Sequence, residues 1–496
     1  MSSNNFRDYY KSMYFSGIHS TPHRYVYSGK LAGAMYAVSE IKDAIPIIHG
    51  PSGCGFHYKY ICRREYLPSY NSQCTDLEEK DIIFGGEEKL RKKILEVSYK
   101  YSPSVIVVIP SVSVDMIGEE IESVVESLKG KVNCRLISIK SEKFSHVDKR
   151  NRKNIIEQRI KNWDNYGYKE TIDFEGCGFV EVMKALVDEV MEEQEKSKNL
   201  INICGLAWGS SGNSIVNGMV KEFKNLGIGL NSIIPNCTIE EITKAPKAEL
   251  NILTRRTQWA KEMEEKFGTG YFHINSFDLY RGLEGIEKLY LKISDILGMK
   301  KEASKILIDR RNKTIEELKP VQKYFKNFNF ALFSSDYKSI PYLIEEYEKD
   351  FKVRLKYICV EMGRDSLDLD MISKETERYL IENMYKALSN VNSRAQIIIN
   401  PSNSEINEMI KDVDYVIGDI NKSYGFNDVK FIEDLDNVTP LDFDGLKERI
   451  NNFAVRLNKI SNGRNLILNK FRYMDDNSNI YGAQQMWEKM WLKRRF

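Results

Sequence analysis

Short runs of apolar, β-branched residues alternate along this chain with longer segments in which apolar residues recur every three or four positions. The first pattern is typical of strands buried on both faces, and the second is typical of helices with one buried face. Their alternation predicts βαβ units built on parallel sheets. The run 105–109, Val-Ile-Val-Val-Ile, is the clearest strand. The helices on either side of it are predicted to point these residues inward: Leu90, Ile94, Val97 and Tyr101 before it, and Ile121, Val124, Val125 and Leu128 after it.

Further strands are predicted in two later groups. The first group follows a charged run at 192–199, and long helical segments at 283–319 close it. Its predicted strands are 200–206, 227–234 and 249–253, and those of the second group are 328–334, 357–360, 395–400 and 415–418. A chain of 496 residues is too long for one hydrophobic core. We therefore predict α/β domains at 1–195, 196–322 and 323–460, and a helical tail at 461–496.

The overall charge excludes two classes of partner. The chain has 73 basic and 71 acidic residues, which gives a net charge of +2. No electrostatic footprint for nucleic acid or for an anionic membrane is visible in such a balance. The first ten residues lack the apolar segment of a signal peptide, and the apolar run at 105–109 is far too short to cross a bilayer. We expect a cytoplasmic protein.

Eight cysteines are scattered along the chain, and no two have the C-x-x-C spacing. Most cysteines of a cytosolic protein are free thiols in the core, and we expect this of five that lie in or beside apolar strands: Cys134, Cys177, Cys204, Cys237 and Cys359. Cys54 is different, because it lies in a loop with three neighbouring glycines, Gly50, Gly53 and Gly55. Glycines allow a bulky ligand to approach the backbone. The sequence favours a ligand-binding role for Cys54.

Two segments in combination carry a family resemblance. They are His-Gly-Pro-Ser-Gly-Cys at 49–54 and Cys-Thr-Asp-Leu-Glu-Glu-Lys-Asp-Ile-Ile-Phe-Gly-Gly at 74–86. Both resemble component 1 of the nitrogenase family, and the resemblance extends over about residues 28–456. It implies three Rossmann-like parallel α/β domains. It also implies an iron–sulfur cluster, of the 4Fe-4S type, held by thiolates at a boundary between subunits.

The resemblance implies up to three cysteine positions in each type of subunit, and this chain fills one of them. Cys54 stands at the second position, the run at 27–34 has no cysteine where the first is expected, and Val112 takes the place of the third. Two arrangements remain open. A homologous partner subunit provides three thiolates and Cys54 the fourth, or a homodimer contributes Cys54 and another cysteine from each chain. Cys74, on the adjacent loop, is the best second ligand, with Cys62 as a further candidate. We expect His49 to orient the loop by a hydrogen bond.

A second region bears on cofactor chemistry. The segment 248–256 resembles the surroundings of the cysteine that binds the nitrogenase cofactor, but Arg255 stands in its place, and no histidine follows His273. We therefore predict that this chain does not ligate a nitrogenase-type iron–molybdenum cofactor. Arg255 and Arg256 either face an anionic ligand or are solvated.

Two further segments are predicted to be turns between a strand and a helix. The loop 204–213 follows a predicted strand and has no nucleotide-binding signature. We expect its residues Trp208 and Ser210 to line a cavity. Phe84 to Glu87 is interpreted as a strand-to-helix turn.

The resemblance predicts a nitrogenase-like oxidoreductase subunit, though not the catalytic alpha subunit of nitrogenase. In this hypothesis a separate ATP-hydrolysing iron protein passes electrons to the interfacial cluster, which reduces a small molecule. One alternative is a scaffold for cofactor assembly. Another is a degenerate member of the family that binds a small molecule or a partner without metal.

Overall fold

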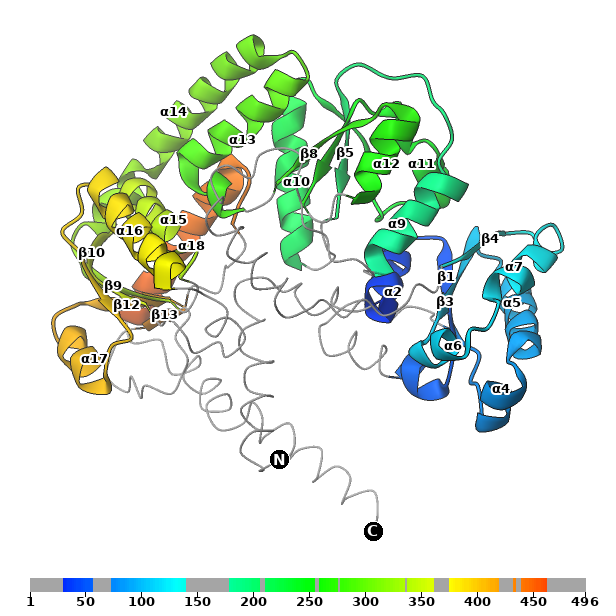
Figure 1. Ribbon diagram of the computed structural model, residues 1–496. Helices are drawn as coiled ribbons and strands as arrows, with labels where there is room; N and C mark the ends of the chain where they lie inside the picture. Colours follow the sequence, from blue (N-terminus) through cyan, green and yellow to red (C-terminus); the bar gives the residue numbers. More distant parts are fainter. Residues whose placement is uncertain are drawn as a thin grey trace. The chain divides into compact units, whose positions relative to one another are not determined.

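A computed structural model provides the structure. It describes residues 30–56, 73–139, 178–205, 210–254, 258–274, 277–334, 337–360, 374–418, 431–433 and 439–461. Within these residues the chain forms three parallel sheets flanked by helices (Figure 1). The chain divides into two compact units. Unit 1 spans Met1–Arg310, Met371–Thr376 and Pro440–Asp442, and unit 2 spans Arg311–Asp370, Glu377–Thr439 and Phe443–Phe496.

The first sheet of unit 1 has the strand order β2-β1-β3-β4, with every pair parallel. Its strands are β1 (Ala44–His49), β2 (Gln73–Cys74), β3 (Val105–Pro110) and β4 (Arg135–Ser138). Its helices are α2 (Lys30–Glu40), α4 (Glu79–Phe84), α5 (Glu87–Tyr101), α6 (Val112–Ile117), α7 (Ile121–Leu128) and α9 (Gly178–Glu189). Every residue of β3 is buried, which confirms the strand predicted at 105–109. The predicted inward residues of α5 and α7 are buried too, except that Tyr101 is half-buried.

The second sheet of unit 1 has the order β6-β5-β7-β8 and is also parallel. Its strands are β5 (Leu200–Cys204), β6 (Gly229–Ile234), β7 (Leu250–Leu253) and β8 (Gly270–His273). Its helical segments are α10 (Ser210–Asn225), α11 (Ile239–Thr243), η1 (Ala245–Lys247), α12 (Gln258–Phe267), η2 (Asp278–Tyr280) and α13 (Gly282–Ile296). Helix α14 (Lys300–Phe325) begins in unit 1 and continues into unit 2, which starts at Arg311. The first three strands agree with the strands predicted at 200–206, 227–234 and 249–253, whereas β8 was not predicted.

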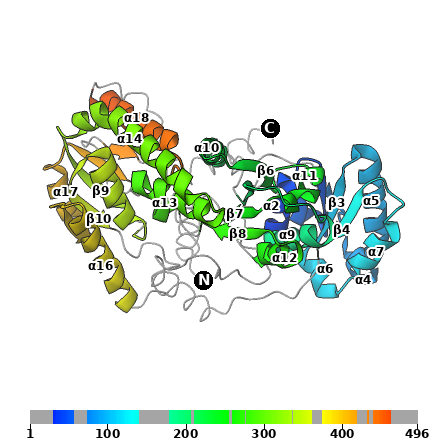
Figure 2. The same ribbon diagram turned by 90° about the horizontal axis from the view of Figure 1, so that it is seen from above.

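The two sheets of unit 1 share one hydrophobic core. Helix α9 packs against both α2 and α12, and the three helices lie together in both views (Figures 1 and 2). Residues of both sheets, such as Ile109 and Leu253, belong to the same buried cluster. Two hydrogen bonds join the segment before β1 to the segment between β6 and α11: Lys42 N donates to Cys237 O at 3.0 Å, and Ile239 N donates to Asp43 Oδ1 at 2.9 Å. The loops that follow β1 and β2 therefore leave a sheet whose core is well packed.

Unit 2 is built on a sheet with the order β11-β10-β9-β12-β13, again parallel. Its strands are β9 (Asn329–Ser334), β10 (Arg354–Val360), β11 (Gln396–Ile399), β12 (Tyr415–Gly418) and β13 (Phe431–Glu433). Its other helices are α15 (Ile340–Glu345), the π-helix η3 (Glu346–Phe351), α16 (Lys374–Asn390), α17 (Asn403–Ile410) and α18 (Phe443–Ser461). Inside it, Arg449 Nη1 contacts both oxygens of Glu346 at 2.7 and 2.8 Å.

The predicted α/β class with parallel sheets is confirmed, as are the strands expected at 328–334, 357–360, 395–400 and 415–418. The division into domains at 1–195, 196–322 and 323–460 stays a prediction. All of the predicted tail beyond residue 461 lies outside the described residues. In the part of the chain that the structure describes, no helix is both long enough and apolar enough to cross a membrane.

Candidate metal centre

The candidate centre lies where β1 and β2 end. After β1 the chain passes through Gly50 and Pro51 into a short helical turn at 52–56, where Cys54 N donates to Pro51 O at 3.0 Å. Strand β2 pairs in parallel with β1, with Ile48 opposite Cys74. Carboxyl ends of parallel strands meet at the same edge of a sheet. The fold thus brings the Cys54 loop and Cys74 to one place.

Cys74 packs directly against the Cys54 loop. Its Sγ donates to Gly50 O at 3.3 Å and lies 3.6 Å from Pro51 O. A Cβ atom added at Gly55 would lie 3.2 Å from Cys74 Cβ and 3.6 Å from its Sγ. Both cysteines are half-buried and free, and they are close enough to interact electrostatically. The two predicted ligands are therefore neighbours, while their role as ligands stays a prediction.

Burial sets the protonation of the two thiols. It raises the pKa of Cys54, and it is also the largest cause of the raised pKa of Cys74, to which the nearby Asp76 carboxylate contributes. Both are therefore thiols at neutral pH, and a metal ion that binds them must displace their protons. Among the described residues, no group of three or more His, Cys, Asp or Glu side chains is placed to hold a metal ion.

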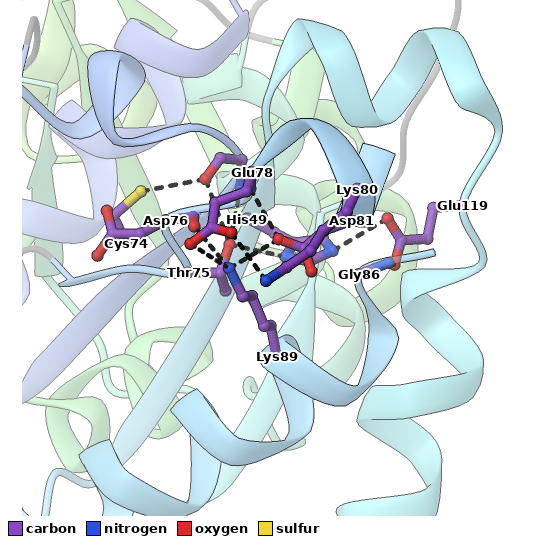
Figure 3. A network of polar contacts seen from close by, with 11 residues as sticks. His49, Cys74, Thr75, Asp76, Glu78, Lys80, Asp81, Gly86, Lys89 and Glu119 are labelled. Carbon is purple, nitrogen blue, oxygen red and sulfur yellow. Dashed lines mark hydrogen bonds and ion pairs between the residues drawn. The ribbon is translucent and has the colours of Figure 1, made fainter. Parts of the chain in front are cut away.

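His49 is connected to the Cys54 loop through Thr75. Its ring is completely buried, with Nδ1 3.0 Å from Thr75 Oγ1 and Nε2 3.2 Å from Glu119 Oε2. Thr75 Oγ1 also accepts a hydrogen bond from Gly50 N at 3.0 Å, and Glu119 Oε1 accepts one from Gly86 N at 2.8 Å. Figure 3 shows His49 between Thr75 and Glu119. The structure agrees with the expectation that His49 orients the loop. Burial lowers its pKa, and the Glu119 charge opposes that effect.

The segment after Thr75 corrects one interpretation. Residues 79–84 form helix α4, so Phe84 to Glu87 is a turn between two helices and not a strand-to-helix turn. Helix α4 begins there because Glu78 and Asp81 form a capping box, in which Glu78 N donates to Asp81 Oδ2 at 2.7 Å. Lys89 Nζ holds the same Asp81 carboxylate at 2.7 Å (Figure 3). The hydrogen bond from Lys89 is the main cause that lowers the pKa of Asp81.

Beside the thiol pair lies an exposed apolar surface that sequence reasoning missed. Helices α4 and α6 contact each other, and their outward side chains include Phe84, 87% exposed, and Met116, 79% exposed. We call the set Phe56, Ile83, Phe84, Val112, Met116 and Ile117 the α4–α6 face. The segments that carry it also hold exposed carboxylates, at Asp76, Glu78, Glu79, Glu87, Glu88, Glu120 and Glu122. Two of them are paired with basic side chains, Glu78 with Lys80 and Glu88 with Arg91. The signal in the sequence was Ile-Ile-Phe within an acidic segment, which a strand interpretation hid.

The other predicted site residues add little to the description of the centre. Arg255, Arg256 and Trp208 lie outside the described residues, and Ser210 is the first residue of α10. Val112, in the place of the third family cysteine, begins α6. Three cysteines expected in the core are buried: Cys204, Cys237 and Cys359. Cys134 is half-buried, and Cys62 and Cys177 lie outside the described residues.

Comparison with known proteins places this chain in a family. A family model described as nitrogenase component 1 type oxidoreductase matches residues 30–434. The chain belongs to this family. The fold agrees, because the solved structure "Nitrogenase Cp1 at pH 6.5" superposes with a TM-score of 0.52 over 90% of both chains, at 17% sequence identity. The predicted resemblance to component 1 and the component 1 fold class are confirmed.

Curated relatives of this component 1 chain include cofactor biosynthesis proteins and nitrogenase chains. The nitrogenase iron–molybdenum cofactor biosynthesis protein NifE of Clostridium pasteurianum is 30% identical over 61% of each chain. Its namesake in Methanococcus maripaludis is 26% identical over 62% of this chain and 59% of its own. The nitrogenase molybdenum–iron protein alpha chain of Methanosarcina barkeri is 25% identical over 61% of this chain and 54% of its own. The chain thus matches these three relatives over 54–61% of their length.

Proposed function

We propose that this chain is a cofactor-assembly subunit of component 1 type, which shelters an iron–sulfur cluster or a metallocofactor precursor at the Cys54 loop. The observation that carries the proposal is the pair of half-buried thiols, Cys54 and Cys74, set against one glycine-rich loop. The relatives named as cofactor biosynthesis proteins support assembly over reduction of a substrate.

The thiol pair suits a shared cluster. Iron–sulfur clusters take thiolate ligands, usually four for each cluster. Cys54 and Cys74 supply two, so the others come from a second chain, either a component-1-like partner or another copy of this one. Both raised thiol pKa values mean that cluster binding releases protons. Binding therefore strengthens as the pH rises.

The absent cofactor ligands support the same proposal. Arg255 replaces the cysteine of the related nitrogenase segment, and the chain has no histidine after His273. A chain without these ligands does not retain a nitrogenase-type iron–molybdenum cofactor as its own catalytic group. A precursor that is later passed on needs no such anchor.

One observation favours the reductase as a second candidate. The α4–α6 face combines exposed apolar side chains with an acidic surround beside the thiol pair. Such a surface fits a partner whose contact face is apolar with a basic surround. In the reductase hypothesis that partner is the ATP-hydrolysing iron protein, which delivers electrons to the cluster.

Transfer and turnover distinguish the two functions. The chain and its partner subunit are loaded with iron and sulfide without oxygen and mixed with a cluster-free acceptor of the family. An assembly subunit loses iron to the acceptor, and the Cys54→Ala variant transfers none. Sustained substrate reduction with an iron protein and ATP, without net transfer of iron, would instead establish the reductase. A protein that binds no iron under either condition is the degenerate, metal-free member.

A further inference from the structure

Glu119 connects three segments that are far apart in the sequence. Its carboxylate is 5% exposed, and its two oxygens have different neighbours. Oε1 accepts the hydrogen bond of Gly86 N at 2.8 Å, at the start of α5. Oε2 lies 3.2 Å from Nε2 of the completely buried His49, at the end of β1 (Figure 3). A Cβ atom at Gly86 would lie 3.1 Å from His49 Cε1, so the glycine allows this close approach.

The chemistry of these groups gives the contacts one direction. The 3.2 Å approach of Glu119 Oε2 to His49 Nε2 is an ion-pair contact that does not have the angle of a hydrogen bond. A carboxylate can only accept, so we assign the ring proton to Nε2, the nitrogen that faces it, and Nδ1 becomes the acceptor. Thr75 Oγ1, 3.0 Å from Nδ1, then donates to the ring in preference to Gly50 O, its other acceptor, which lies farther away at 3.4 Å. The same oxygen accepts from Gly50 N at 3.0 Å. The order is thus Gly50 to Thr75 to His49 to Glu119.

Gly50 links this chain of bonds to the thiols. Its carbonyl oxygen accepts Cys74 Sγ at 3.3 Å and Leu77 N at 3.0 Å. We propose that Glu119 is the positioning residue of the thiol pair: by fixing the tautomer of His49, it holds the Cys54 loop against Cys74. This inference deepens the proposed function and rests on it only for the statement that the pair binds a cluster.

Replacement of Glu119 by glutamine tests the proposal closely. The site needs two acceptors, one for Gly86 N and one for His49 Nε2, and an amide has only one. Because the backbone donor of Gly86 cannot change, the amide NH₂ turns toward His49. The ring proton should then move to Nδ1. In iron-free protein labelled with ¹⁵N-histidine, we expect the Nε2-protonated form in the wild type and the Nδ1-protonated form in Glu119→Gln.

A second readout follows the thiols themselves. Alkylation rates are measured by mass spectrometry at Cys54 and Cys74, with the distant half-buried Cys134 as an internal reference. We expect Glu119→Gln to raise the rates at both sites at least threefold relative to Cys134. Glu120→Gln, which removes a neighbouring exposed carboxylate, should leave all three rates unchanged. Thr75→Val breaks the same chain of bonds with Glu119 intact, and it should reproduce the faster alkylation if Glu119→Gln does not fold.

Each outcome decides the proposal. If His49 keeps its proton on Nε2 in Glu119→Gln, or if the alkylation ratio stays at the wild-type value in the folded variants, Glu119 is not the positioning residue. Both readouts use iron-free protein, so they stand even if the wild type never binds iron. Iron is measured separately: its absence from the wild type would overturn the proposed function alone, and its loss from Glu119→Gln would support both.

Discussion

The three glycines around Cys54 are equivalent in the sequence but differ in the structure. A Cβ atom at Gly50 would lie 2.3 Å from Ser111 Oγ and 2.5 Å from Ser111 Cβ. At Gly55 it would lie 3.2 Å from Cys74 Cβ, whereas at Gly53 it would meet no atom within 4 Å. The sequence predicts that the loop is tight but not which glycine makes it so, because the nearest atoms belong to β2 and to the start of α6.

This difference predicts opposite results for two neighbouring substitutions. Gly50→Ala should lower the free energy of unfolding by about 1–3 kcal/mol, because Ser111 must move. Gly53→Ala should change it by less than about 1 kcal/mol, since the added methyl group meets nothing. Denaturant unfolding of both variants gives the comparison. Equal losses would show that the loop does not pack as described.

His49 predicts a dependence of stability on pH. Burial lowers its pKa below the ordinary value of 6.5, so the unfolded chain takes up a proton at a higher pH than the native protein does. Stability should therefore fall as the pH drops through about 6.5 and below. His49→Gln should reduce this slope in unfolding experiments at several pH values. If the Glu119 charge outweighed burial, acidification would stabilise the wild type relative to His49→Gln.

At the scale of elements, regular patterns were predicted well and short elements poorly. Strand β3 is a continuous apolar run and helices α5 and α7 have a clear helical period, so their buried residues were predicted correctly except for the half-buried Tyr101. Helix α4 has six residues and no buried side chain, so its pattern gave no helical signal. Strand β8, Gly-Tyr-Phe-His, is short and half-exposed. Such elements depend on local capping and on neighbouring strands, which hydrophobic patterning does not report.

An asparagine ladder crosses the second sheet of unit 1. Asn231 donates to Asn202 Oδ1 at 2.9 Å, and Asn202 donates to Asn251 Oδ1 at 2.8 Å. Asn202 and Asn251 are completely buried, one on β5 and the other on the neighbouring β7. A buried amide that loses its partner carries a cost of about 1–3 kcal/mol. The ladder therefore couples three parallel strands through side chains.

A double-mutant cycle measures this coupling. Asn202→Leu and Asn251→Leu should each lower the free energy of unfolding by at least about 1 kcal/mol, because each removes one hydrogen bond from the buried amide that remains, although Asn202 keeps its bond to Ala245 O. The double variant should lose clearly less than the sum of the two, since neither amide of the pair then remains. Strict additivity, measured by urea unfolding, would mean that the two side chains do not interact.

At the scale of the whole molecule, the sequence predicts the architecture and the cysteines but not the contact surface. The motifs at 49–54 and 74–86 were enough to name the family and to select Cys54 and Cys74. The α4–α6 face became visible only when α4 and α6 were seen side by side with their apolar residues exposed. Neither the substrate nor the partner could be predicted from the sequence, since both depend on surfaces that this chain forms together with other chains.

The α4–α6 face predicts an effect on association without an effect on folding. Phe84→Ala should weaken binding of the partner about tenfold or more, since exposed aromatic residues often dominate interfaces. Tyr99→Ala on α5 is the matched control, because Tyr99 is 93% exposed and belongs to a different surface. Titration calorimetry with the partner subunit and with an iron protein shows which of them is affected. Unchanged affinity for both would remove this face from the account.

Iron bound through Cys54 is the central claim, and metal analysis tests it most directly. Iron and acid-labile sulfide are measured per chain in anaerobically purified protein with its partner subunit, for the wild type and for Cys54→Ala, Cys74→Ala and Cys134→Ala. The account predicts iron and sulfide in the wild type and in Cys134→Ala, a partial loss in Cys74→Ala, and almost none in Cys54→Ala. A Cys54→Ala variant that keeps the full wild-type content of both would contradict it.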